Sequence, residues 1–222
     1  MQAPTVSWSG AIQRNLSDQL FAWLDHAAPG SRPPIDTPAP DGKTALMAAA
    51  AAGDAALLAR LLALGARPDQ VNAKGASALI YGAWAGNPAV IELLLRQRVP
   101  LDQAASNGWT AMTMAAAKGR ATVIRQLLAA GAAVDPPDIY GWTPLMRACN
   151  LGRENVVRVL RERGGASLAR INTSGQTALH VAAAAGQMAI YRWLLAQGAD
   201  PTLRDFQQRR PIDLVPGSVS GR

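Results

Sequence analysis

Two series of glycines recur along the chain with one period, and they limit the fold more than any other feature. Within each series, successive glycines are 33, 33, 33 and 34 residues apart, and the second series follows the first by eleven residues. The first series is Gly42, Gly75, Gly108, Gly141 and Gly175, and the second is Gly53, Gly86, Gly119, Gly152 and Gly186. A constant period of this length is typical of a tandem repeat protein, whose units bury their apolar faces only against their neighbours.

Each repeat has the residue pattern of two short antiparallel helices. In the first repeat, Thr44 is placed to cap a helix by accepting a hydrogen bond from an unpaired backbone N–H. The Ala49-Ala50 pair keeps this first helix slim enough for a neighbouring repeat to stack closely. Gly53 ends it and turns the chain, and Leu57-Leu58 begin the apolar stripe of a second helix. The other four repeats follow the same order.

The residues between the two glycines resemble the opening motif of the ankyrin repeat family. The stretches that carry the resemblance are Tyr140-Gly141-Trp142-Thr143-Pro144-Leu145 and Ser174-Gly175-Gln176-Thr177-Ala178-Leu179-His180. The resemblance implies an all-α fold, an ankyrin-type solenoid of stacked helix-turn-helix repeats with β-hairpin-like loops. It also implies a concave groove lined by the first helices and the hairpin tips.

The resemblance covers five repeats, and the flanking segments have the pattern of caps. The repeats are predicted at 41–73, 74–106, 107–139, 140–173 and 174–206. Residues 1–40 are predicted to form a capping helix over 11–28 and a Pro-rich connector over 29–40. Residues 207–222 are predicted to form a degenerate C-terminal cap and a frayed tail.

Two departures from the pattern mark the ends of second helices. Arg98 stands where Gly65, Gly131 and Gly198 lie in other repeats, so we expect a left-handed backbone there with strain of about 1 kcal/mol. The fourth repeat has one extra residue, which we place within Gly164-Gly165-Ala166, with Gly164 as the equivalent glycine.

The net charge of +7 is concentrated near the C-terminal half, with +4 in residues 140–173 and +2 in residues 207–222. This excess favours a partner with an acidic patch, and it lacks the density of a dedicated nucleic-acid binder. No apolar run is long enough for membrane insertion. Because no signal peptide is recognisable, we expect a cytoplasmic protein. A bacterial periplasmic location is the alternative if Gln2 is a mature N-terminus after a removed leader.

The residues that could carry catalysis are few and have structural explanations. His180 lies in the helix-opening motif, where family resemblance implies a hydrogen bond to the cap hydroxyl. His26 lies near the end of the predicted N-terminal helix, where the helix dipole favours it, and Cys149 occupies a small-residue position of the repeat. We therefore predict no enzyme activity and no cofactor or metal site.

Repeat position predicts which side chains line the groove. With the first glycine as position 2, the groove and hairpin tips comprise mainly positions 1, 3, 8, 11 and 12. Five of the eleven aromatic residues fall on these positions in the three middle repeats. The predicted partner-binding residues are Tyr81, Trp84, Trp109, Met114, Lys118, Tyr140, Trp142, Arg147 and Asn150. The alternative is that several of these aromatics fill the hairpin row by packing against the next repeat.

These residues predict a non-enzymatic scaffold that is monomeric alone and binds another protein through its concave groove and hairpin tips. An inhibitor or immunity-type role is one form of this hypothesis. The alternatives are an accessory protein that stabilises or protects a partner enzyme, and association with nucleic acid through the arginines of the fourth repeat.

Overall fold

The computed structural model describes residues 5–26 and 35–216. Gln2, residues 27–28 of the predicted capping helix, residues 29–34 of the predicted connector and residues 217–222 of the predicted tail lie outside the described residues. The chain forms two compact units, unit 1 (residues 1–106) and unit 2 (residues 107–222). The division falls where the sequence places the boundary between the second and third repeats, and each unit is taken by itself below.

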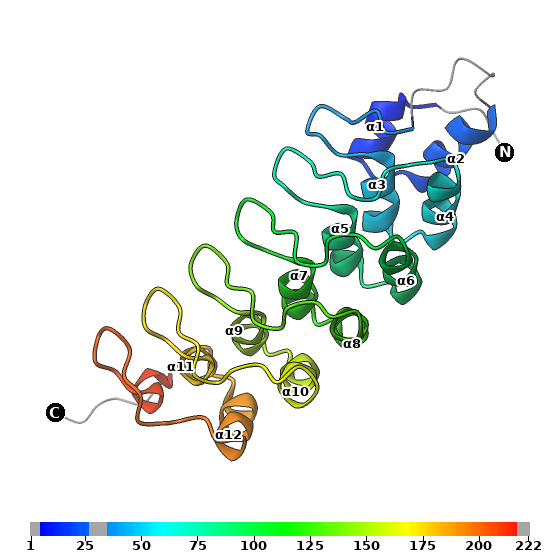
Figure 1. The fold of residues 1–222 in the computed structure, drawn as a ribbon. Helices are drawn as coiled ribbons and strands as arrows, with labels where there is room; N and C mark the ends of the chain where they lie inside the picture. The colour runs from blue at the N-terminus through cyan, green and yellow to red at the C-terminus, as the bar shows by residue number, and fades with distance from the viewer. Residues whose placement is uncertain (1–4, 27–34, 217–222) are drawn as a thin grey trace. The chain divides into compact units, whose positions relative to one another are not determined.

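The predicted all-α class is confirmed. The helices of unit 1 are α1 (Trp8–Gln13), α2 (Ser17–His26), α3 (Ala45–Ala52), α4 (Ala55–Ala63), α5 (Ala78–Ala85) and α6 (Pro88–Arg96). Those of unit 2 are α7 (Ala111–Lys118), α8 (Ala121–Ala129), α9 (Pro144–Asn150), α10 (Glu154–Glu162), α11 (Ala178–Ala184), α12 (Met188–Ala196) and a 3-10 helix, η1 (Pro211–Leu214). In both units a loop precedes each first helix of a repeat and projects to one side of the helix pairs (Figure 1). We call it the hairpin loop.

First helices are capped as predicted, and most of their residues are buried. Thr44 Oγ1 accepts a hydrogen bond from Met47 N at 3.3 Å, and Ser77, Thr110, Thr143 and Thr177 cap the equivalent helices in the same way. Neighbouring first helices contact each other, α3 with α5 in unit 1 and α7 with α9 and α9 with α11 in unit 2. Their small side chains permit this approach, so the core runs along the first helices of each unit.

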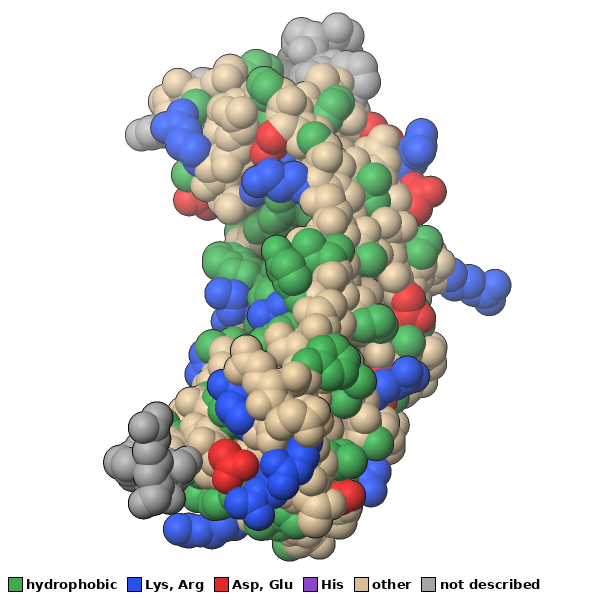
Figure 2. Space-filling view, turned by 90° about the vertical axis from the view of Figure 1, so that its left-hand side faces the viewer, with side chains coloured by type: hydrophobic (Ala, Val, Ile, Leu, Met, Phe, Trp, Pro, Cys, Tyr) green, Lys and Arg blue, Asp and Glu red, His purple; other side chains and the backbone are tan. Residues whose placement is uncertain are grey.

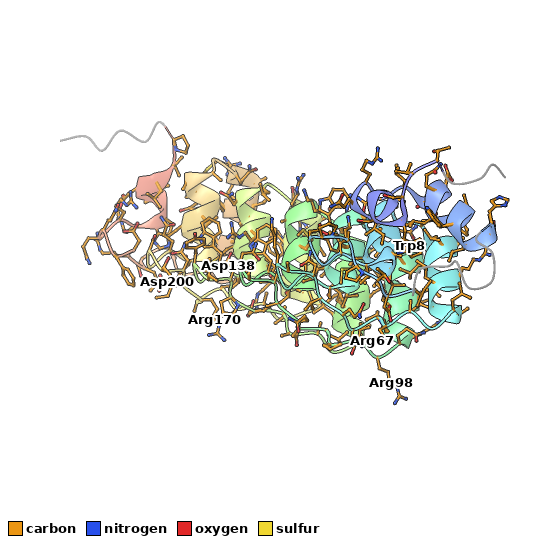
Figure 3. The ribbon with its side chains drawn as sticks, turned by 90° about the horizontal axis from the view of Figure 1, so that it is seen from above. Trp8, Arg67, Arg98, Asp138, Arg170 and Asp200 are labelled. Atoms are coloured by element: carbon orange, nitrogen blue, oxygen red, sulfur yellow. The ribbon has the colours of Figure 1, made fainter. Side chains whose placement is uncertain are left out.

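Second helices are amphipathic and bury three apolar side chains each against the first helices. In α4 these are Leu57, Leu58 and Leu61, and in α10 they are Val156, Val157 and Leu160. After α6, Arg98 has φ 55°, so the predicted left-handed residue at this helix end is confirmed. Its side chain projects away from the ribbon (Figure 3).

The prediction for the end of α10 was wrong in one detail. The residue with positive φ is Gly165 (φ 67°), and Gly164 is the inserted residue before it. A Cβ at Gly164 would lie 2.7 Å from both the Leu160 carbonyl oxygen and Val134 Cγ2. Glycine is therefore required at Gly164 by close packing and at Gly165 by backbone conformation.

The N-terminal cap is a pair of helices, so the prediction of one helix over 11–28 was wrong. Asn15, with φ 55°, separates α1 from α2. The start of the second helix at Ser17 agrees with the sequence pattern. Trp8 and Trp23 join the pair edge to face, with ring centroids 6.5 Å apart. Helices α1 and α2 both contact α3, so the pair covers the first repeat.

The C-terminal segment continues the repeat pattern for one hairpin loop and one turn of helix. Gln208, at φ 62°, takes the place of the first glycine of a repeat, and Asp205 N donates to the Arg209 carbonyl at 2.9 Å. The 3-10 helix η1 then contacts α11. Within the described ranges, no helix has the length and hydropathy of a membrane span.

Candidate protein-binding surface

A buried Asp or Asn organises four of the hairpin loops. In unit 2, Asp138 Oδ1 accepts hydrogen bonds from Tyr140 N and Trp142 N, both at 2.9 Å. Asn172 and Asp205 accept the equivalent pair of backbone N–H groups in the next two loops, and Asn72 does so in unit 1. Asp138 is buried among the side chains of unit 2 (Figure 3). The loop backbone is therefore fixed from inside, which leaves its outer side chains available for contact.

Arg147 links this loop to two tryptophan rings. Its guanidinium forms an ion pair with Asp138, with Nε 3.1 Å from Oδ2. The central carbon of this guanidinium, Cζ, lies 4.6 Å from the centroid of the Trp142 ring and 5.2 Å from that of the Trp109 ring. Only 20% of the Arg147 side chain is exposed, against 0% for Asp138. We call Trp109, Trp142, Arg147 and Asp138 the arginine stack; it holds both rings in place.

Large apolar side chains are exposed on the hairpin loops of unit 2. The exposed fractions are 57% for Ile139, 59% for Tyr140, 50% for Ile171 and 68% for Phe206. Neighbouring loops are joined by backbone hydrogen bonds, from Thr173 N to the Tyr140 carbonyl at 3.0 Å and from Phe206 N to the Ser174 carbonyl at 3.1 Å. We call Ile139, Tyr140, Ile171 and Phe206 the hairpin edge of unit 2. Figure 2 looks onto the side of the hairpin loops, where hydrophobic side chains are interspersed with Lys and Arg.

The remaining predicted residues of unit 2 lie on the first helices. Met114 is half-buried on α7, whereas Lys118 at the end of α7 and Asn150 at the end of α9 are exposed. The structure thus brings Trp109, Trp142 and Arg147 together in the arginine stack and places Tyr140 on the loop that Asp138 organises. In the free protein the Arg147 guanidinium is thus engaged with Asp138 and lies near both rings.

The two predicted residues of unit 1 have different surroundings. Asn72 Nδ2 donates to the Tyr81 hydroxyl at 2.9 Å, and Lys43 Nζ lies 5.0 Å from the centroid of the Tyr81 ring. Lys43 also bonds Asn15, which ties the N-terminal helix pair to the first hairpin loop. Burial lowers the pKa of Lys43, and burial together with Asp41 raises the pKa of Tyr81. Trp84 is 44% exposed on α5.

Of the three groups considered for catalysis, His180 and Cys149 are buried, and His26 is exposed at the end of α2. Thr177 Oγ1 and His180 Nδ1 share a hydrogen bond of 2.8 Å, and His180 Nε2 lies 3.2 Å from the Arg209 carbonyl oxygen. Burial lowers the pKa of His180 and raises that of the Cys149 thiol. Histidine here completes a helix cap, and the cysteine fills space between helices. Among the residues described, no three His, Cys, Asp or Glu are grouped so that they could hold a metal ion.

Sequence reasoning missed two sets of residues: those that organise the loops, and some of those exposed on the surface. The organising residues Asn72, Asp138, Asn172 and Asp205 recur near the repeat period, with alanines at two equivalent positions, Ala39 and Ala105, so spacing alone could have found them. Ile139 and Phe206 lie one residue after members of that series. This offset could have predicted their exposure, because successive side chains of an extended loop point to opposite sides.

Comparison with known proteins agrees with this architecture. The family model "Ankyrin repeats (3 copies)" matches residues 10–104 and 98–171, and the model "Ankyrin repeat" matches residues 174–206. The structure of the human ASB11 ankyrin repeat domain superposes with a TM-score of 0.82, at 23% identity, covering 97% of this chain and 94% of that one. Human NF-kappa-B inhibitor delta is 53% identical over 45 residues, which span 18% of this chain and 14% of that protein. The chain belongs to the ankyrin repeat family.

Proposed function

We propose that this chain binds a partner protein through the hairpin edge of unit 2. Ankyrin repeats are generally non-enzymatic modules that act as protein–protein interaction scaffolds. The observation that carries the proposal is the exposure of Tyr140 and Ile139, 59% and 57%, on a loop held by buried Asp138. Ordered loops lose little conformational entropy on binding, so a few exposed anchors on them contribute efficiently to affinity.

The predicted partner-binding residues take two roles in this proposal. Tyr140 contacts the partner directly, and Trp142 and Trp109 contribute the exposed parts of rings that Arg147 holds in place. Met114, Lys118 and Asn150 contribute contacts along α7 and α9 at the margin of the surface. Tyr81 and Trp84 would form a separate contact on unit 1, for which the exposure of Trp84 is the supporting observation.

Affinity capture from the native organism's lysate, followed by mass spectrometry, tests the assignment. The double variant Ile139→Ser/Tyr140→Ala should lose a protein that the wild type captures, because it removes the exposed anchors and keeps Asp138. Leu64→Ala is the matched control, since Leu64 is also exposed, 45%, but lies at the end of α4 in unit 1. Equal capture by the double variant and the control would contradict the assignment.

The effect on the partner distinguishes two forms of the function. An inhibitor is favoured by the short match to a protein named as an inhibitor, 53% identical over 45 residues. If this form is right, the captured partner's activity should fall when the wild-type chain is added. An accessory protein would leave that activity intact and slow its loss on heating or oxidation.

A further inference from the structure

We infer that the hairpin edge of unit 2 takes an acidic peptide segment carrying hydrophobic side chains. This inference rests on the proposed function and names its partner class. Its first support is the division of charge between the two units. Residues 1–106 contain eight Lys and Arg and eight Asp and Glu, whereas residues 107–222 contain fourteen and seven. The whole net charge of +7 therefore belongs to unit 2.

Most acidic side chains of unit 2 are already engaged within the unit. Four of its seven carboxylates form ion pairs within the unit: Asp138, Glu154, Asp205 and Asp213 pair with Arg147, Arg158, Arg209 and Arg210. A fifth, Asp135, accepts a hydrogen bond from Ser167 N at 2.8 Å. Most remaining charges of the unit are cationic, so its field attracts an acidic partner and speeds the encounter.

Exposed basic and apolar residues are close in sequence on the hairpin loops. Exposed Arg170 precedes Ile171 and projects away from the ribbon (Figure 3). In the following loop, exposed Arg204 and Phe206 flank buried Asp205. Arg204 Nη1 donates to the Gln208 carbonyl at 2.6 Å, which holds its guanidinium close to the loop. A peptide that covers these loops would therefore have both hydrophobic and cationic groups within reach.

This mixture favours a peptide over a nucleic acid. Nucleic-acid affinity comes mainly from dense contacts to phosphates, and single strands add stacking on aromatic rings. The hairpin edge instead places the aliphatic side chains Ile139 and Ile171 with the aromatic rings of Tyr140 and Phe206. A phosphate backbone offers nothing for aliphatic side chains to pack against. A peptide with Leu, Ile or Phe between Asp and Glu residues would contact both the apolar and the basic side chains of this edge.

Selection from a random 12-residue peptide display library on the full chain tests this inference. We expect enriched peptides with net negative charge and several large apolar residues, whose binding weakens as salt rises. The double variant Arg170→Glu/Arg204→Glu should bind them about tenfold or more weakly, because like charges would then face one another. The matched control is Arg67→Glu/Arg96→Glu in unit 1, whose side chains are 66% and 68% exposed, and it should bind as the wild type does.

The outcomes separate this inference from the proposed function. Enriched peptides that are neutral or basic, but lost by Ile139→Ser/Tyr140→Ala, would overturn the acidic partner and leave the hairpin edge as the site. Peptides unaffected by that double variant would overturn both. Failure to enrich any peptide would overturn the inference that the partner binds through a linear acidic segment. Binding of a single-stranded oligonucleotide that depends on Arg170 and Arg204 but not on the apolar side chains would assign the basic side chains to nucleic acid.

Discussion

Replacing Asp138 tests how the hairpin loop of unit 2 is organised. The carboxylate is buried, accepts two backbone N–H groups through Oδ1 and pairs with Arg147 through Oδ2. Asp138→Ala removes the acceptor of both backbone N–H groups. It also leaves the guanidinium of Arg147, whose side chain is only 20% exposed, without its counter-charge. Breaking a buried ion pair from one side costs about 3–5 kcal/mol, and we expect a loss in this range.

Asp138→Asn separates the two tasks of this carboxylate. Asn72 and Asn172 show that an asparagine in this place accepts the two backbone N–H groups equally well. The amide nitrogen would face the donors of Arg147, however, so the charge-assisted part of the interaction is lost. We expect this variant to cost about 1–3 kcal/mol, clearly less than the alanine variant.

A second substitution should restore part of the stability that Asp138→Asn loses. In unit 1, Asn72 Nδ2 donates to the hydroxyl of Tyr81, nine residues later, at 2.9 Å. Arg147 has the same separation from Asp138. The double variant Asp138→Asn/Arg147→Tyr therefore transfers the unit 1 arrangement to unit 2. We expect its loss of stability to be smaller than the sum of the two single losses, by about 1 kcal/mol.

Denaturant unfolding and thermal melting measure these differences, and hydrogen exchange localises them. Each kcal/mol lowers the Tm of a chain of this size by about 2–4 °C, so Asp138→Ala should melt about 10 °C below the wild type. The amides of Tyr140 and Trp142 should exchange faster in this variant. Equal costs for the alanine and asparagine variants, or strict additivity in the double variant, would refute the reasoning.

Three other perturbations address helix ends, the buried histidine and the buried thiol. Gly65→Ala should destabilise unit 1 by about 1–2 kcal/mol through backbone strain alone in denaturant unfolding, because φ is +87° and a Cβ there meets nothing within 4 Å; no loss would contradict this. Burial holds the folded pKa of His180 below 6.5, so its contribution to stability is complete above pH 6.5 and is lost as pH falls through the folded pKa. Urea unfolding of His180→Gln, which keeps a helix-capping side chain, should lack this part of the pH dependence; an unchanged pH profile would refute the assignment. Cys149 is buried with a raised thiol pKa, so a thiol reagent should modify it only after unfolding, and rapid modification of the native protein would show that the site opens.

Local features of the helices were predictable because they depend on residues close in sequence. The caps at Thr44, Ser77, Thr110, Thr143 and Thr177 follow from a hydroxyl that reaches the backbone N–H three residues later. The left-handed residue at Arg98 follows from its alignment with glycines of other repeats. The break at Asn15 was not predictable in this way, since the apolar pattern continues across it.

Contacts between separate segments of the chain account for what the sequence left undetermined. Arg147 was assigned to partner binding because position alone placed it on the groove. The structure shows that it reaches back nine residues to Asp138 and that its guanidinium also lies near the ring of Trp109, from the preceding repeat. The exposure of Ile139 and Phe206 was missed for a different reason, because the periodic series of their inward-turned neighbours Asp138 and Asp205 was not recognised. The candidate surface is therefore shifted from the predicted helix positions toward the loop edge.

Hydrogen exchange with mass spectrometry, on the chain alone and in complex with the captured partner, tests the central claim most directly. The account predicts that binding slows exchange in the loop segments 138–142, 171–176 and 203–209 of unit 2, with little change in α8, α10 and α12. Protection confined to those second helices, or to unit 1, would contradict the assignment of the hairpin edge as the binding surface.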